Sequence, residues 1–313
     1  MRAVNPLLKT LLIAGALSVA TSSCSTISQA DIVVEVDGQS VDQETLDRLL
    51  TEYSDRSDIF GTDAIGDDLT VDAAQTRLLL SAVVRVTTLS ALLATADTSI
   101  TTADTDLYFA NVPDDSPIRE LSSEMQLLIA TTNRDVVNSA LSRVPKPTDA
   151  ELEASYRHQP ISTGLLCVRH ILVPTEDEAK TIITKLEDGA DFAELAKTES
   201  TDTIAASTGG ALSGTDSQCL TTSQYVSSFD PGFVRGAFAA PSSGWTAPVK
   251  SQFGWHIIMN RPWEEVSADV IASVNGRDGG ILVIDGKLNS ADIYVDPRYG
   301  KWDPPTGRAE PVG

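Results

Sequence analysis

VRHILV, at residues 168–173, is the stretch that decides the fold of this chain, and a second run of the same kind, FGWHII, follows at residues 253–258. Short apolar runs rich in β-branched side chains predict buried β-strands. The chain has three histidines, and each run carries one of them, His170 and His256. The two strands are therefore predicted to hold imidazoles in apolar surroundings. A buried structural histidine is the alternative at either position.

Helix signals fill the space between the two runs. Thr175 and Glu178 have the spacing of a capping box, and the helix that they begin is predicted to end at Gly189. A second helix is predicted over residues 191–197, before a Ser-Thr-Asp turn at residues 200–202. Between this turn and the second run lie a glycine-containing motif and three aromatic residues, namely Gly209, Gly210, Ala211, Leu212, Phe229, Phe233 and Phe238.

The order and spacing of these motifs resemble the parvulin family of peptidyl-prolyl isomerases over residues 165–261. The resemblance implies an α+β fold, the parvulin βα₃βαβ₂ domain, with the two strand histidines side by side beneath the substrate site. It also implies site residues, namely the catalytic group His170, Asp202 and His256 and the substrate-binding aromatics Phe229, Phe233 and Phe253. Buried packing, or an ordinary turn for the aspartate, is the alternative. Residues 211–214 depart from the family pattern, so we expect the loop that follows to differ in shape.

The chemistry implied by the resemblance is rotation about the peptide bond that precedes proline. This rotation has a barrier of about 18–20 kcal/mol and breaks no covalent bond. We therefore expect no metal, no cofactor and no nucleophile, and we expect the histidines to support catalysis rather than act as general acid or base. Phospho-specific parvulins carry a basic loop after the first strand, whereas residues 174–178 here are acidic, so phosphorylated substrates should be repelled.

The N-terminus has the pattern of an export signal, predicted over residues 1–23 with a tether at 24–30. Its apolar run at residues 11–20 is too short for the roughly 20 residues of a membrane-spanning helix. Cys24 follows small residues in the manner of a lipobox, which favours lipidation at Cys24 and an anchor on the extracytoplasmic face of the cell membrane. Ordinary cleavage after Ala20, giving a secreted or periplasmic protein, is the alternative.

Three cysteines are present, and a lipidated Cys24 leaves an even pair. A disulfide between Cys167 and Cys219 is then plausible in an oxidising compartment. Two buried free thiols are the alternative, because bridging depends on backbone spacing that the sequence does not show. The cysteines and histidines lack the spacing of a metal site.

The flanking segments differ in character from the middle of the chain. Residues 31–146 are predicted to be mainly helical, with one long helix at 71–95 and another from 116 to about 145. A linker helix is expected in 147–163, the parvulin domain in 164–262, and in 263–313 a segment with strands at 281–284 and 293–295 and a disordered tail. The strand predicted at 32–36, which precedes a helix capped by Ser40 and Gln43, could pair with 293–295 and join the chain ends.

This layout resembles the SurA and PrsA foldases, in which a SurA-like N-terminal chaperone region precedes the parvulin domain. The resemblance implies an isomerase and chaperone that acts on unfolded or newly exported polypeptides containing X-Pro bonds. A non-catalytic holdase is the alternative, and an envelope lipoprotein that uses the domain for peptide binding is a third. The net charge of −21 argues against nucleic-acid and anionic-lipid partners.

Overall fold

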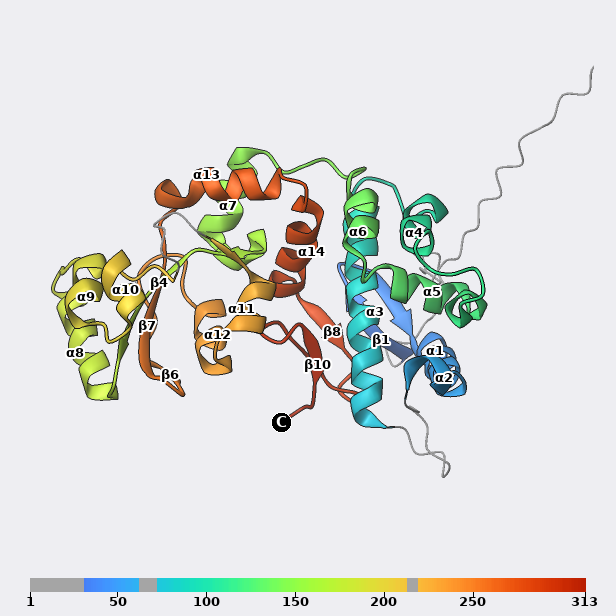
Figure 1. The fold of residues 1–313 in the computed structure, drawn as a ribbon, viewed down its shortest axis with the longest axis horizontal. Helices are drawn as coiled ribbons and strands as arrows, with labels where there is room; N and C mark the ends of the chain where they lie inside the picture. The colour runs from blue at the N-terminus through green and yellow to red at the C-terminus, as the bar shows by residue number, and fades with distance from the viewer. Residues whose placement is uncertain (1–30, 62–71, 213–218) are drawn as a thin grey trace, which may run out of the picture.

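The computed structural model describes residues 31–61, 72–212 and 219–313. Cys24 and the predicted signal therefore lie outside the described residues. Figure 1 shows two bodies, with the segment around the histidine strands on one side and the N-terminal helices together with the C-terminal strands on the other. Below, the first is called the isomerase-like domain (residues 164–262) and the second the flanking module (residues 31–146 and 263–313).

An antiparallel sheet forms the centre of the isomerase-like domain, in the order β4 (Val168–Val173), β7 (Gly254–Asn260) and β6 (Val249–Ser251). In this register Leu172 lies opposite His256, and His170 lies opposite Ile258. The histidines are thus diagonal neighbours on adjacent strands, within reach of each other.

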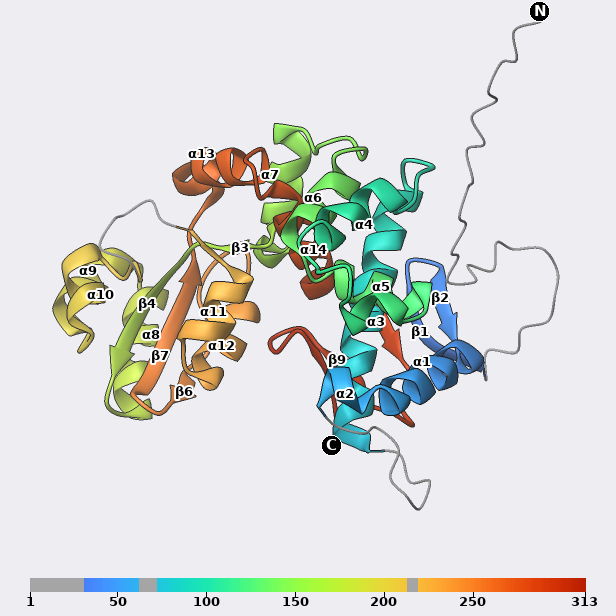
Figure 2. The same cartoon turned by 45° about the vertical axis from the view of Figure 1, so that its right-hand side comes forward.

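Helices cover both faces of this sheet. On one face, α8 (Glu176–Glu187) and α9 (Phe192–Glu199) pack with Ile171 and Ile257, followed by α10 (Thr203–Thr208). On the other face, α11 (Thr222–Ser228) and α12 (Pro231–Phe238) pack on β4 and β7 (Figure 2). The predicted capping box is present, since the Glu178 N–H donates to Thr175 Oγ1 at 3.2 Å.

The α+β class is confirmed. Relative to the βα₃βαβ₂ pattern, the second strand is reduced to a single bridge between Arg169 and Ala211, the first residue of the departure noted at 211–214. Residues 213 and 214 lie outside the described residues. A two-stranded sheet of β3 (Leu165–Leu166) and β5 (Leu220–Thr221) lies beside it. Cys167 stands between β3 and β4, and a disulfide joins it to Cys219 just before β5.

The flanking module is built around α3 (Ala73–Ala94), close to the long helix predicted at 71–95. By length and composition α3 could span a membrane, yet 56% of its most apolar window is buried inside the protein. It packs on a three-stranded sheet in the order β2 (Gln39–Asp42), β1 (Ile32–Val36) and β8 (Ile293–Val295). Three further N-terminal helices are α1 (Gln43–Asp55), α2 (Ser57–Phe60) and α4 (Thr102–Phe109).

The predicted pairing of the chain ends is confirmed, because β1 and β8 are antiparallel neighbours with Glu35 opposite Tyr294. The strand predicted at 281–284 is wrong. These residues lie in α14 (Gly279–Ser290), which follows α13 (Trp263–Val274). A short apolar run fits a buried helix as well as a strand, and only the packing of α14 on α3 and α6 (Arg134–Leu141) decides between them.

Two further expectations about secondary structure are corrected. The tail predicted to be disordered forms a hairpin, β9 (Lys301–Asp303) and β10 (Arg308–Glu310), whose Ala309 is buried against the module. The helix predicted from 116 to 145 is three helices, η2 (Pro117–Glu120), α5 (Ser123–Ala130) and α6 (Arg134–Leu141).

Local hydrogen bonds explain where these helices begin. Ser122 caps α5 and donates its N–H to Glu52 on α1, while the Asn133 side chain caps α6. Ser40 lies in β2, and Asp42 caps α1 instead, accepting from the Thr45 N–H at 2.8 Å. Serine and asparagine compete for backbone groups, and this breaks the apolar periodicity that predicts one continuous helix.

The linker contains α7 (Asp149–His158) and η3 (Pro160–Thr163). Here α14 approaches η3 so closely that a β-carbon at Gly286 would overlap the Ser162 carbonyl. Gly164, with φ 73°, turns the chain from η3 into β3 beneath the Leu282 carbonyl. The C-terminal segment therefore packs against both the linker and the N-terminal sheet.

Candidate active site

The two strand histidines meet at the centre of the isomerase-like domain. His170 on β4 and His256 on β7 are both buried, and their Nδ1 atoms lie 3.1 Å apart. Their rings are nearly parallel, with centroids 5.4 Å apart. Two neutral imidazoles in this contact need one donor and one acceptor, so their tautomers must differ.

A chain of polar contacts fixes which histidine donates. The His170 Nε2 lies 3.3 Å from the Asp202 Oδ2, within ion-pairing distance although not in hydrogen-bond direction, and the Ser251 Oγ lies 2.7 Å from the His256 Nε2. The carboxylate only accepts, so the His170 proton belongs on Nε2. The Nδ1 of His170 then accepts from His256, and the Nε2 of His256 accepts from the serine hydroxyl. The Phe253 N–H donates to the same Ser251 Oγ at 3.1 Å.

Electrostatics set the charge of two members of this chain, Asp202 and His256. Contact with His170 and with the backbone N–H groups of Ala205 and Ile204 outweighs burial and lowers the pKa of Asp202 to about 2. Burial, together with the neighbouring His170, lowers the pKa of His256 to about 4. At neutral pH the site therefore holds an ionised Asp202 and a neutral His256.

Aromatic side chains stand directly over the histidines. Phe233, near the start of α12, is buried and presents its ring at steep angles to both imidazoles, with centroid distances of 5.4 Å to His170 and 4.9 Å to His256. Phe229 lies next to it at 5.5 Å. Phe253 lies at the turn between β6 and β7 and is 67% exposed, so it stands at the rim of the site and is not part of a packed wall.

All six proposed site residues line one cavity of about 380 Å³. Its further lining residues are Leu172, Thr201, Thr203, Leu212, Ser228 and Asp230. Phe238, by contrast, is the last residue of α12 and lies outside this cavity, partly buried against the core of the domain. The cavity combines an apolar wall with a polar floor and is large enough for a proline ring and its neighbours in an extended peptide.

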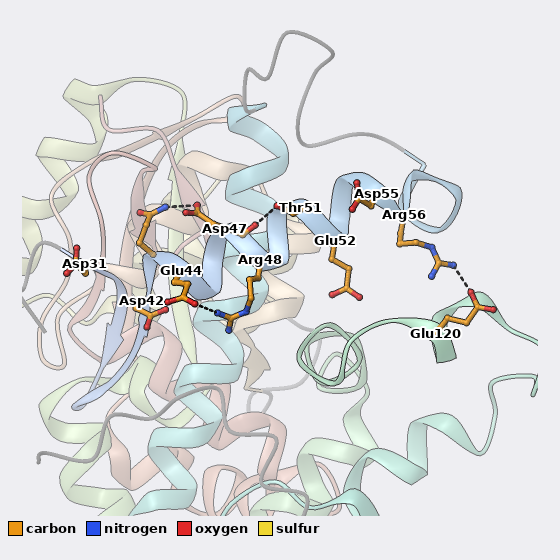
Figure 3. Close-up of a pocket in the computed structure, with 11 residues that line it drawn as sticks. Asp31, Asp42, Glu44, Asp47, Arg48, Thr51, Glu52, Asp55, Arg56 and Glu120 are labelled. Atoms are coloured by element: carbon orange, nitrogen blue, oxygen red, sulfur yellow. Dashed lines mark hydrogen bonds and ion pairs between the residues drawn. The ribbon is translucent and has the colours of Figure 1, made fainter. Parts of the chain in front are cut away.

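A larger cavity, of about 980 Å³, lies elsewhere, along α1 in the flanking module (Figure 3). Carboxylates such as Glu44, Asp47 and Asp55 surround it, with Arg48 paired to Glu44. It holds none of the aromatic or histidine side chains that the chemistry requires. The smaller cavity is therefore the candidate active site.

Sequence reasoning missed two residues of this site. Ser251 fixes the tautomer of His256, and Asp230 caps α12 through the N–H groups of Gly232 and Phe233 at 2.8 and 3.3 Å. The Asp-Pro-Gly start of α12 is a recognisable cap signal and could have identified Asp230. Ser251 gave no such signal, because a serine five residues before a histidine is common in any chain.

The arrangement can grip an apolar ring and orient fixed dipoles beneath it. Within the described ranges, no cluster of three or more histidine, cysteine or carboxylate side chains could hold a metal ion. The site fits a reaction that redistributes charge without breaking bonds.

Comparison with known families assigns the segment directly. Residues 170–261 match the model of the rotamase family described as the PPIC-type PPIase domain. The match begins at one strand histidine and ends just after the strand that carries the other.

Curated relatives match part of the chain. The chain is 37% identical over 148 residues to the foldase protein PrsA of Clostridium kluyveri, covering 45% of this chain and 40% of that protein. It is 42% identical over 106 residues to foldase protein PrsA 2 of Listeria innocua, covering 33% of each. The matches thus span less than half the length of these relatives.

The solved structures that are similar to this chain include the crystal structure of PrsA from Bacillus subtilis. It is 20% identical, with a TM-score of 0.28, over 85% of this chain and 94% of that one. The solution structure of NmPin, the parvulin of Nitrosopumilus maritimus, is 32% identical over 31% of this chain and 95% of that one, with a TM-score of 0.27. The family model covers the segment that holds the histidine pair. Residues 170–261 of this chain are therefore a PPIC-type, or parvulin, peptidyl-prolyl isomerase domain.

Proposed function

We propose that the chain is a peptidyl-prolyl cis-trans isomerase and folding chaperone for exported polypeptides. The observation that carries the proposal is the polar chain from Ser251 through His256 and His170 to Asp202, which lies beneath an aromatic cavity. Structural histidines would require neither the open cavity above them nor an ionised carboxylate at its edge. We assign the catalytic role to His170, Asp202 and His256, and proline binding to Phe229, Phe233 and Phe253.

In the proposed mechanism, the proline ring enters between Phe229 and Phe233 and the imide carbonyl loses water. Twisting the peptide bond destroys its resonance, so an apolar site that desolvates the bond and fits the twisted form lowers the barrier. The chain of fixed dipoles ends in the Asp202 carboxylate and matches the changed charge on the twisted imide. His256 is neutral at pH 7, so the proposed role of the pair is to orient these dipoles rather than to transfer protons.

The chaperone part of the proposal places the client polypeptide against the flanking module as well as the active site. The curated relatives that match this chain are named foldases, which supports action on polypeptide substrates. We propose the domain bounds 31–146, 147–163, 164–262 and 263–313 for this division of labour. The paired ends of the chain make the flanking module a separate packed unit, and we propose that its surface binds the client polypeptide.

The proposed location is the extracytoplasmic face of the cell membrane, with Cys24 as a lipid anchor. The bridge between Cys167 and Cys219 supports an oxidising compartment, because disulfides persist outside the reducing cytosol. Intact-mass measurement of the membrane fraction tests the anchor. A mature chain that carries no lipid and begins near Thr21 would refute it and leave a secreted or periplasmic protein.

A proline-isomerisation assay on the mature full-length chain tests the activity. Phe233→Ala should lower kcat/KM by about tenfold or more, since a buried aromatic contact is worth about 1.5–3 kcal/mol. Asp202→Asn should also lower it, because the amide keeps the helix cap but removes the charge at the end of the dipole chain. Glu187→Gln, on the exposed side of α8, is the matched control.

Aggregation assays run in parallel with the same four proteins. If the wild-type chain and both site variants are equally inert toward X-Pro peptides while all suppress aggregation, the chain is a non-catalytic holdase and the isomerase proposal fails.

A further inference from the structure

Two carboxylates line the active-site cavity, each at the N-terminus of a different helix. Asp202 caps α10, and Asp230 caps α12. The Asp230 Oδ1 accepts from two N–H groups of its own helix, and its Oδ2 accepts from the Gln252 N–H at 3.3 Å. Backbone donors hold both charges in place, at the edges of the pocket formed by Phe229 and Phe233.

Positive side chains near the cavity are directed elsewhere. Lys250 is adjacent to Ser251 on β6 and so points to the opposite face, where its Nζ lies 5.8 Å from the Trp255 ring. Arg169 donates to the Gly209 carbonyl at 2.9 Å and pairs with Glu265. Among the described residues that line the cavity there is no lysine or arginine, so no permanent positive charge offsets the carboxylates.

We propose that this site selects X-Pro bonds flanked by lysine or arginine and disfavours glutamate or a phosphorylated residue there, with Asp230 as a specificity-determining residue. The inference rests on the proposed isomerase function. A proline ring held by Phe229 and Phe233 leaves the adjoining side chain at the cavity edge, close to one or both carboxylates. A cation gains attraction there, a carboxylate meets repulsion, and a phosphate dianion meets about twice that repulsion.

Three peptides that differ only before the proline, Lys-Pro, Ala-Pro and Glu-Pro, test this on the mature full-length chain. We expect kcat/KM to fall in that order. The Lys to Glu ratio should be about five- to twentyfold at low ionic strength, from attraction and repulsion of the size of exposed ion pairs. Salt should compress the ratio, because the carboxylates are partly exposed.

Asp230→Asn isolates the assigned residue. Asparagine can accept the same backbone N–H groups, so α12 keeps its cap while the charge is lost. The Lys to Glu ratio should then fall about two- to fivefold, the worth of one such ion pair. Glu187→Gln removes an equal charge from the exposed face of α8 and should leave the ratio unchanged.

The outcomes separate the two proposals. If the Ala-Pro peptide is not isomerised at all, the proposed function fails, and the same ratio is then read from dissociation constants of the three peptides. A Lys to Glu ratio near one in either readout overturns the selectivity. An equal fall of the ratio in Asp230→Asn and Glu187→Gln overturns the assignment to Asp230, because net charge would then account for the preference.

Discussion

The isomerase domain and the flanking module reach stability by opposite routes. The isomerase domain is one continuous segment whose strands β4 and β7 enclose all of its helices, whereas the module is made from the two ends of the chain joined at β1 and β8. Ordered local motifs therefore reveal the first, while the second depends on contacts between residues more than two hundred positions apart. We therefore expect a substitution within residues 164–262 to affect mainly the isomerase domain, whereas a change at either end of the chain affects the flanking module.

The two bodies also touch. The turn of the C-terminal hairpin reaches α12, where the Arg235 guanidinium lies 3.1 Å from the Asp303 carboxylate. α12 carries Phe233 two residues earlier, so the module contacts the helix that forms part of the proposed proline pocket.

Removal of residues 280–313 should give the largest effect. It deletes most of α14, β8 and the hairpin, and with them the buried Ile284, Leu288 and Val295 of the module core. We expect the unfolding transition of the flanking module to vanish in calorimetry. Deletion of residues 311–313 alone is the control, and a melting profile unchanged by the longer deletion would contradict the closed-ends architecture.

The double substitution Cys167→Ala/Cys219→Ala should destabilise the isomerase domain and spare the module. The bridge closes a sequence separation of 52 residues, for which loop entropy corresponds to at most about 4 kcal/mol, with 2–4 kcal/mol typical. Denaturant unfolding followed by a probe in each body measures this. A shift of the module transition as large as that of the isomerase domain would show that the two do not unfold separately.

Acid should weaken the isomerase domain before the module. The pKa of His256 is about 4 in the folded state and near 6.5 in the unfolded state, so the folded domain binds fewer protons between these two pH values. Its stability should fall as pH drops from about 6.5 to 4, by at most about 3 kcal/mol, and kcat/KM should fall near pH 4.

In the module, burial alone would raise the pKa of Asp104. Hydrogen bonds from Arg143, Ser139 and Thr101 outweigh burial and hold this pKa at about 2, so the corresponding loss occurs between about 3.8 and 2. Burial raises the pKa of Asp285, which opposes this loss as pH falls. Thermal melts from pH 8 to 3 measure both transitions, and an acid-induced fall in the module first would be contrary to expectation.

The contact between the bodies should give the smallest effect. A double-mutant cycle of Arg235→Ala and Asp303→Ala should show a coupling of about 0.2–1 kcal/mol, since the arginine side chain is 55% exposed. The free energy of unfolding of each single and double variant supplies the cycle. A coupling indistinguishable from zero would mean that the hairpin does not hold α12 in solution.

Prediction from sequence succeeded where local signals agree with the final packing. The strands around His170 and His256, the capping box at Thr175 and the long helix α3 all follow from short-range patterns. It failed at residues 281–284, because the same short apolar run fits a helix or a strand. It also failed beyond residue 300, where the Pro- and Gly-rich composition predicts disorder but a hairpin packs on the module through the buried Ala309.

The parvulin motifs, the aromatic residues, the two histidines and Asp202 could be predicted from the sequence alone, because residue type and spacing are local properties. Only the tertiary structure decided that Ser251 and Asp202 end one chain of contacts through both histidines, and that Asp230 reaches the same cavity from α12. The physical reason is distance along the chain. Hydrogen-bond direction and charge proximity depend on how strands and helices pack, and spacing along a sequence does not specify that packing.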